Sequence, residues 1–198
     1  MGEAAQLIRC LGGVLALALA ASAVAQDYAI EGSCRDGAPH GNYELRGPSG
    51  QVRVVGAFAR GKRTGSFLFW SSVGARIAQL PFDDDALSGT VALWYPPAGR
   101  AREGQPKLEA AYAAGRLHGL KRSWHPDGRV RSEYHYDRGR LVDARAFNAM
   151  GAALATTAAE AQAARDLVTD DQYYATLADL VRAHRPQCPS ALDRLERQ

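Results

Sequence analysis

The sequence predicts a mainly β protein, an elongated antiparallel β-meander of about five hairpin repeats with a C-terminal α-helical cap. Three observations predict this fold class. The 198 residues include 20 glycines and 9 prolines, which is typical of many turns and short strands. An internal period runs through the middle of the chain, and a helical pattern follows it. The expected domains are a signal peptide at 1–25, a β-repeat domain at 26–154, and a helical cap and tail at 155–198.

The first segment has the order of a secretory signal peptide. Arg9 precedes a largely apolar run at 11–24, and Ala-Val-Ala at 23–25 forms an A-x-A cleavage site before Gln26. The run is shorter than the ~20 apolar residues that span a bilayer as a helix. We therefore expect cleavage after residue 25 and a soluble periplasmic or secreted chain without a transmembrane span. An uncut N-terminal anchor is the alternative.

The repeat is defined by leading positions that share one phase, at spacings of 24, 24, 30 and 24 residues. These positions are Cys34, Phe58, Phe82, Tyr112 and Tyr136. Three residues after each stand Gly37, Gly61, Asp85, Gly115 and Gly139, and seven residues after each stand Gly41, Gly65, Gly89, Gly119 and Asp143. The longer interval is explained by an insertion at 100–106, which is polar and turn-rich.

Each unit is expected to form two short antiparallel strands joined by tight turns. The segments 48–50 (Pro-Ser-Gly) and 126–128 (Pro-Asp-Gly) carry Pro and Gly where a β-turn requires them. Alternation predicts one strand face with Val130, Ser132, Tyr134 and Tyr136, and the other face with Arg131, Glu133 and His135. Glycine at the third position permits the turn. Glycine at the seventh would let a neighbouring backbone or an aromatic ring come close.

The stretch at 54–65, Val-Val-Gly-Ala-Phe-Ala-Arg-Gly-Lys-Arg-Thr-Gly, resembles the MORN repeat. That repeat has the pattern aromatic, any, Gly, any, aromatic, any two, Gly, any three, Gly. The segment 112–119 is similar to its second half, and the 24-residue period with a following Trp is similar to the bacterial variant of antitoxin-like proteins. The resemblance covers about 30–154 and implies an antitoxin or immunity role in which a toxin is neutralised. The chain departs from the pattern at Val54, Leu80, Asp85, Ala110, Tyr134 and Asp143.

After the repeats the pattern becomes helical. Capping boxes beginning at Thr157 and Thr169 predict two helices, at 157–168 and 171–184. The second helix has an apolar stripe made by Tyr173, Leu177, Leu180 and Val181. We expect the stripe to cover the last repeat, because an array must hide its terminal edge. A detachable partner-binding helix is the alternative.

Two cysteines, Cys34 and Cys188, remain after cleavage, and export favours a disulfide between them. Cys34 stands where other units have Phe or Tyr, so a small buried hydrophobic residue is the alternative. Its repeat lies about 45 Å from the last one, at ~4.8 Å per strand. The bridge therefore requires helices that run back along the sheet, or a sheet that curls.

No catalytic residue, metal site or cofactor is predicted. His40 and His118 each precede a seventh-position glycine, so shared register explains them. His125 and His135 lie near acidic residues, but metal-ligand spacing is absent from the sequence. The run 83–85 (Asp-Asp-Asp) is interpreted as a solvated turn, because it lacks the alternation of a calcium loop.

These features favour a non-enzymatic exported module that binds a protein or a cell-envelope component across one sheet face. Trp70, Trp94 and Trp124 share one register, and Trp and Arg are enriched at binding hot spots. A buried aromatic ladder is the alternative for these three residues. The formal net charge of +3 does not indicate a nucleic-acid partner. A hydrolase acting through His118 and His125 is a further alternative.

Overall fold

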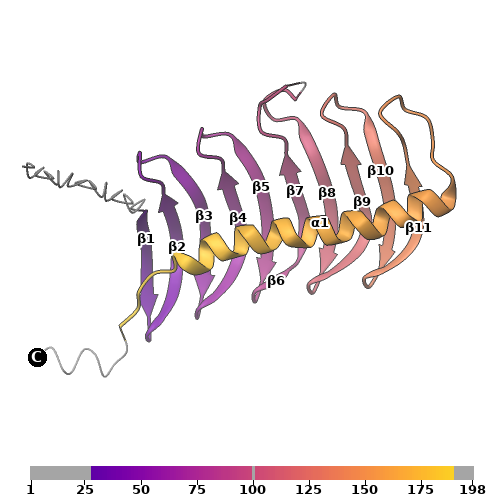
Figure 1. The fold of residues 1–198 in the computed structure, drawn as a ribbon. Coiled ribbons are helices and arrows are strands. Elements are labelled where there is room, and N and C mark those ends of the chain that lie inside the picture. The colour runs from indigo at the N-terminus through magenta and orange to yellow at the C-terminus, as the bar shows by residue number, and fades with distance from the viewer. Residues whose placement is uncertain (1–27, 100, 190–198) are drawn as a thin grey trace, which may run out of the picture.

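The computed structural model describes residues 28–99 and 101–189, so the expected signal peptide and its cleavage site lie outside the described residues. Within these ranges, eleven strands form one antiparallel sheet and a single helix lies across it (Figure 1). The strands neighbour one another in chain order, except that the short β6 pairs with β5 beside the main path. The predicted mainly β antiparallel meander with a C-terminal helix is therefore confirmed.

The first half of the sheet contains β1 (Ala29–Arg35), β2 (Ala38–Arg46), β3 (Val52–Ala59), β4 (Lys62–Trp70), β5 (Arg76–Asp83) and β6 (Ala86–Leu87). The second half contains β7 (Gly89–Trp94), β8 (Pro106–Ala113), β9 (Arg116–Trp124), β10 (Val130–Asp137) and β11 (Arg140–Ala146). The helix α1 spans Thr156–Ala183. In the described part of the chain, this helix has no stretch apolar enough to cross a bilayer.

Five two-residue turns lie along the lower edge of the sheet in Figure 1. The turn residues are Asp36-Gly37, Arg60-Gly61, Asp84-Asp85, Ala114-Gly115 and Arg138-Gly139. Their φ angles are 47–52° at the first position and 71–86° at the second, as a type I′ hairpin turn requires. Asp85 stands where the other four turns have glycine. Its φ angle is 71°, so the backbone follows the same path in this turn.

The upper edge carries the Pro-Gly turns and the longer insertion loop. Gly50 N–H donates to the Gly47 carbonyl at 2.8 Å and Gly128 N–H donates to the His125 carbonyl at 2.9 Å, so both predicted β-turns are confirmed. A bulge follows the second turn, between Val130 and Ser132. Two successive residues of a bulge oppose a single partner residue, which breaks the alternation of faces. The prediction that Arg131 lies on the face opposite Ser132 was therefore wrong, because Arg131 contacts α1. The expected common face of Val130 and Ser132 was also wrong, because Val130 pairs with Trp124 while Ser132 pairs with the buried Ser123.

The prediction of two helices was also wrong, because α1 is one continuous helix of 28 residues. The Thr169 hydroxyl donates to the Arg165 carbonyl at 3.0 Å, so it is satisfied inside the helix instead of capping a new one. The helix begins after Ala155, without a side-chain cap. At ~1.5 Å per residue it is about 42 Å long, close to nine strand spacings of ~4.8 Å.

The helix runs back over one face of the sheet, from β11 toward β2 (Figure 1). The expectation that its apolar stripe covers the last repeat was therefore wrong. Tyr174, Leu177 and Val181 are buried well away from β11, over the middle and first half of the sheet. The apolar stripe packs against the broad face because that face offers far more apolar area than one terminal edge.

The core lies between α1 and the covered face. Of the leading residues, Phe58, Phe82 and Tyr136 are buried and Tyr112 is partly buried. Phe67 is fully buried at the centre, with ring centroids 6.2 Å from Tyr43 and 5.5 Å from both Phe58 and Phe82.

An aromatic ring does approach a glycine closely, but at Gly56 and not at the seventh positions. A Cβ on Gly56 would lie 2.6 Å from the Phe67 ring. The seventh-position glycines are instead needed for positive φ angles of 67–111°. They are Gly41, Gly65, Gly89 and Gly119.

A disulfide joins Cys34 and Cys188, whose Cα atoms are 5.6 Å apart, so this prediction is confirmed. Cys34 is exposed on β1, and Cys188 follows the end of α1. The geometric condition for the bridge is met because the helix returns along the whole sheet. The bond ties the end of the helical segment to the first strand, in the register that Phe or Tyr holds in the other units.

Candidate binding face and polar network

The sheet has one covered and one open face. Buried residues such as Phe69, Leu93 and Ser123 point toward α1. Their neighbours along the strands point to the opposite face, because successive side chains in a strand alternate. No other element of the described chain lies over that second face, which we call the open face.

Trp70, Trp94 and Trp124 lie on the open face, where they are the last residues of β4, β7 and β9. One strand separates each from the next, so they are spaced at about 10 Å along the sheet. All three are half-buried. The structure therefore brings the three predicted tryptophans into one row near the upper edge. Their burial is intermediate between the exposed surface and the buried ladder that the sequence left as alternatives.

Polar neighbours hold this row in place. The Arg76 guanidinium lies 4.2 Å above the centroid of the Trp94 ring, a cation–π contact, and Arg76 pairs with Trp70 across the ladder. The Trp70 carbonyl accepts a hydrogen bond from Arg53 Nε at 3.0 Å. The Trp124 carbonyl accepts one from the Tyr95 hydroxyl at 2.8 Å. These bonds fix the ends of the strands from which the indoles project.

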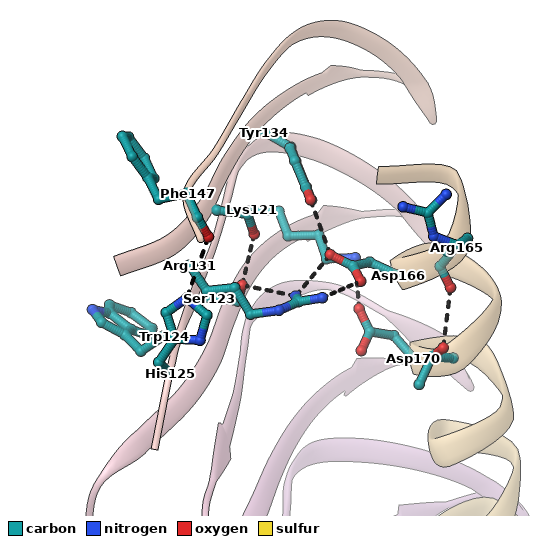
Figure 2. A network of polar contacts seen from close by, with 12 residues as sticks. Lys121, Ser123, Trp124, His125, Arg131, Tyr134, Phe147, Arg165, Asp166 and Asp170 are labelled. Carbon is teal, nitrogen blue, oxygen red and sulfur yellow. Dashed lines mark hydrogen bonds and ion pairs between the residues drawn. The ribbon is translucent and has the colours of Figure 1, made fainter. Parts of the chain in front are cut away.

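A fourth aromatic residue, Phe147, extends the row and was missed by the sequence analysis. Figure 2 shows Trp124 and Phe147 on the same side of the strands, away from α1. Phe147 follows β11 eleven residues after Tyr136, whereas the tryptophans stand twelve residues after their leading positions. The pairing of Tyr134 with Ala144, against Ala110 with Lys121, shows that β11 has one residue fewer than β9 between the leading position and this point of the ladder. Asp143 in place of glycine was the only signal of that change. We call Trp70, Trp94, Trp124 and Phe147 the aromatic row.

The centre of the open face mixes apolar and polar side chains, and Glu109 stands opposite Ala92 there. Val55 pairs with Leu68, and Gln79 lies between Leu68 and Ala92 in the ladder. Charged pairs stand on either side of this centre: Glu31 opposite Glu44 toward β1, and Arg122 with Glu133, 2.6 Å apart, toward β11. A face of mixed apolar and polar side chains is in keeping with a non-obligate protein interface, which is about as apolar as the rest of a protein surface.

A polar network lies on the other face, under the first half of α1 (Figure 2). Arg131 donates two hydrogen bonds to Asp166, from Nη1 to Oδ2 at 2.8 Å and from Nη2 to Oδ1 at 2.7 Å. The Tyr134 hydroxyl donates to the same carboxylate at 2.9 Å. The hydrogen bonds to Asp166 raise the pKa of Arg131, so this pair remains charged.

A second ion pair is more deeply buried. Lys121 is 2 % exposed, and its Nζ lies 2.5 Å from Asp170 Oδ2, although neither atom makes a well-directed hydrogen bond. Burial raises the pKa of Asp170, and the attraction of Lys121 only partly offsets this. Beside the pair, the Ser123 and Ser132 hydroxyls share a hydrogen bond of 2.6 Å. These groups bind each other, and the arrangement holds the helix on the sheet.

The histidines singled out by the sequence have structural neighbours. Nδ1 of His40 accepts the backbone N–H of Arg60, and Nδ1 of His118 accepts that of Arg138, both at 3.4 Å. The two histidines make the same contact at equivalent positions of their units, which fits a structural role set by the repeat. His125 Nε2 lies 3.3 Å from the Phe147 carbonyl. Among the described residues, no three His, Cys, Asp or Glu side chains gather as a metal site would require.

The acidic run forms a turn whose carboxylates pair with the preceding turn. Lys62 Nζ lies 2.6 Å from Asp84 Oδ2, and Arg63 Nε donates to Asp85 Oδ1 at 2.8 Å. The backbone N–H of Arg63 donates to the same oxygen at 2.9 Å. Burial opposes ionisation of Asp85, but the hydrogen bonds and charge of Arg63 outweigh it and lower the pKa of this carboxyl.

Comparison with known proteins adds no further assignment. A scan against models of protein families and a search of curated proteins found no match to this chain. The function is therefore inferred from the sequence pattern and from the two faces of the sheet.

Proposed function

We propose that this chain is an exported, non-enzymatic MORN-like repeat protein that binds a protein or a cell-envelope component through its open face. One observation carries the proposal: α1 covers one face, while the aromatic row stands on the other, on the same face as the apolar pair Val55 and Leu68. Half-buried aromatic rings on strand ends that hydrogen bonds hold in place lose little conformational entropy on binding, which favours association.

The MORN-like assignment is supported by the local geometry of the units. The five lower turns have the same pair of positive φ angles at the same place in each unit, including the unit with Asp85 in place of glycine. The leading aromatic residues Phe58, Phe82, Tyr112 and Tyr136 all contribute to one core under α1.

Export is supported by the disulfide and by the signal-like first segment. A bond between Cys34 and Cys188 persists in oxidising compartments such as the periplasm or the extracellular medium. The antitoxin or immunity role stays a prediction from the resemblance alone.

A capture experiment tests the proposed function. The mature chain, purified with its disulfide, is cross-linked to an envelope extract from the source cells and captured proteins or glycans are identified. We expect a saturable partner for the wild type, and its loss in Trp94→Ala/Trp124→Ala. Val168→Ala is the matched control, because Val168 is an exposed apolar residue on α1, on the other side of the sheet.

Folding of each variant is checked by circular dichroism before capture. Equal capture by the wild type and the double tryptophan variant would exclude the open face as the binding surface. A captured toxin whose activity the chain blocks would favour the immunity role.

A further inference from the structure

A cleft of about 270 Å³ lies beside the second half of α1, on the covered side of the sheet. It is lined by three arginines, Arg63, Arg182 and Arg185, and by a single carboxylate, Asp85. The charge of the lining is therefore +2, from three cations and one anion. Phe58 and Val181 form its apolar wall. The open-face proposal leaves this cleft unexplained.

Two of the guanidinium groups are held in fixed positions. Arg185 donates a hydrogen bond to the Gly61 carbonyl, and its guanidinium carbon lies 5.3 Å from the centroid of the Phe58 ring. Arg63 is fixed by Asp85, and its guanidinium carbon lies 4.0 Å above the Phe82 ring. Both arginines are thus stacked on leading aromatic residues of neighbouring units. A guanidinium held in this way has little freedom left to lose when it binds a ligand.

The internal carboxylate leaves part of the positive charge without compensation. Asp85 is bonded to Arg63 through Oδ1, and its lowered pKa keeps it ionised at neutral pH. Arg182 pairs with Asp179 on the exposed side of the helix, at 2.6 Å. Arg185 has a carbonyl partner and no ion pair among the described residues. The charge of Arg185 helps to lower the pKa of Asp85, but that carboxylate is bonded to Arg63, so Arg185 is the cleft arginine without a direct ion pair among the described residues.

We propose that this cleft binds an oxyanion, a phosphate or carboxylate group that carries a small apolar substituent. The planar fork of arginine matches both groups, because it can donate two parallel N–H bonds to their oxygens. Arg185 and Arg182 would bind the oxyanion, and Phe58 and Val181 would contact the substituent. This site lies on the helix side, so the proposal stands whether or not the open face binds a partner.

Anion-dependent thermal unfolding of the mature, disulfide-bonded chain tests the proposal. Inorganic phosphate and acetate are titrated separately, with sodium chloride keeping the ionic strength constant. Because a ligand that binds only the folded state raises the unfolding midpoint, we expect a saturable rise with at least one of the two anions. A stronger response to phosphate assigns a phosphate ligand, and a stronger response to acetate assigns a carboxylate; either result supports the site.

Two variants locate the binding. Arg182→Gln is expected to weaken the apparent affinity several-fold, and Arg185→Gln at least tenfold, in chains that circular dichroism shows to be folded. Arg165→Gln is the matched control, because Arg165 is exposed on the same helix and does not line the cleft. An unfolding midpoint that rises as much with chloride as with phosphate and acetate would overturn the proposal. An identical response in Arg182→Gln, Arg185→Gln and the control would do the same.

Discussion

The two halves of α1 are held on the same sheet face by different chemistry. The first part of α1, up to Asp170 at the midpoint of the helix, contacts β9 and β10 through charges, with Asp166 on Arg131 and Asp170 on Lys121, and it also buries Ala159 and Ala163. The second half is apolar, with Leu177 and Val181 buried over the first half of the sheet. After the helix, the disulfide and a bond from the Tyr43 hydroxyl to the His184 carbonyl, 3.0 Å long, close the contact.

The difference shows that one part of α1 supplies most of the buried apolar area, while another part sets the position of the helix along the sheet. Apolar burial stabilises by about 25 cal/mol per Å² but has no preferred direction, so a helix on an aromatic surface could slide. The ion pairs oppose sliding. Asp166 and Asp170 are about 6 Å apart along the helix and meet β10 and β9, which are about 4.8 Å apart, so one helical turn lies over one strand. We therefore interpret the polar half as setting the position of α1 and the apolar half as supplying its stability.

Truncation is expected to cost most in the aromatic cluster of the sheet that α1 covers. Phe67→Ala removes the ring that packs against Gly56 and three aromatic neighbours, and should lower the free energy of unfolding by about 3–5 kcal/mol. Urea denaturation measures the loss, with Ser66→Ala on the open face as the control. A loss below about 1 kcal/mol would be less than burial of the ring area alone predicts and would contradict a central role for the aromatic cluster.

The buried ion pair of the polar half should behave differently when one or both partners are replaced. Lys121→Met leaves Asp170 buried without its partner and should cost about 3–5 kcal/mol, whereas Lys121→Met/Asp170→Leu should lie near the wild type. A double-mutant cycle by urea denaturation measures the coupling. Additive losses would show that the two side chains act independently.

The same variant has a pH signature. The pKa of Asp170 is raised in the folded state, so the folded chain binds the additional proton and stability falls as pH rises from the unfolded value toward the folded one. Without Lys121 the pKa should rise further, so the penalty of Lys121→Met should shrink in acid. A penalty that grows in acid would contradict this account.

The disulfide should matter most for the second half of the helix. Replacing both Cys34 and Cys188 by Ala is expected to lower the free energy of unfolding by about 2–4 kcal/mol. Hydrogen exchange should accelerate more around Leu177 and Val181 than around Asp166, since the ion pairs still hold the first half. Uniform acceleration along α1 would argue against separate roles for the two halves.

The smallest effect is expected at the third lower turn. Asp85→Gly relieves a positive φ of 71° but removes the ion pair with Arg63, so at pH 7 stability should stay within about 1 kcal/mol of the wild type. The lowered pKa of Asp85 means that its contribution is complete above the unfolded pKa and is lost as pH falls through the folded one. Denaturation in acid should therefore favour the glycine variant, and a constant difference across pH would refute this linkage.

Much of the backbone path could be predicted because its signals are local. The tight turns follow from Gly and short polar residues at fixed offsets, and even Asp84-Asp85 keeps the geometry of Gly-containing turns. The tryptophan row follows from periodicity, because equal spacing in the chain becomes equal spacing across the sheet. Phe147 was not predicted as a member of the row, because β11 lacks one residue and Phe147 therefore stands eleven residues after its leading position instead of twelve. Only the pairing between strands shows this shift.

By itself, the sequence predicted the antiparallel meander, the turns at its lower edge and, as one of two alternatives, the disulfide between Cys34 and Cys188. Only the tertiary structure decided that α1 is one helix lying along the sheet, that Arg131 turns toward it, and that three arginines meet in a cleft. The physical reason is the separation in sequence over which the interactions act. Turn and strand preferences act between residues a few positions apart, whereas the place of the helix depends on apolar area and charges contributed by strands far away in the chain.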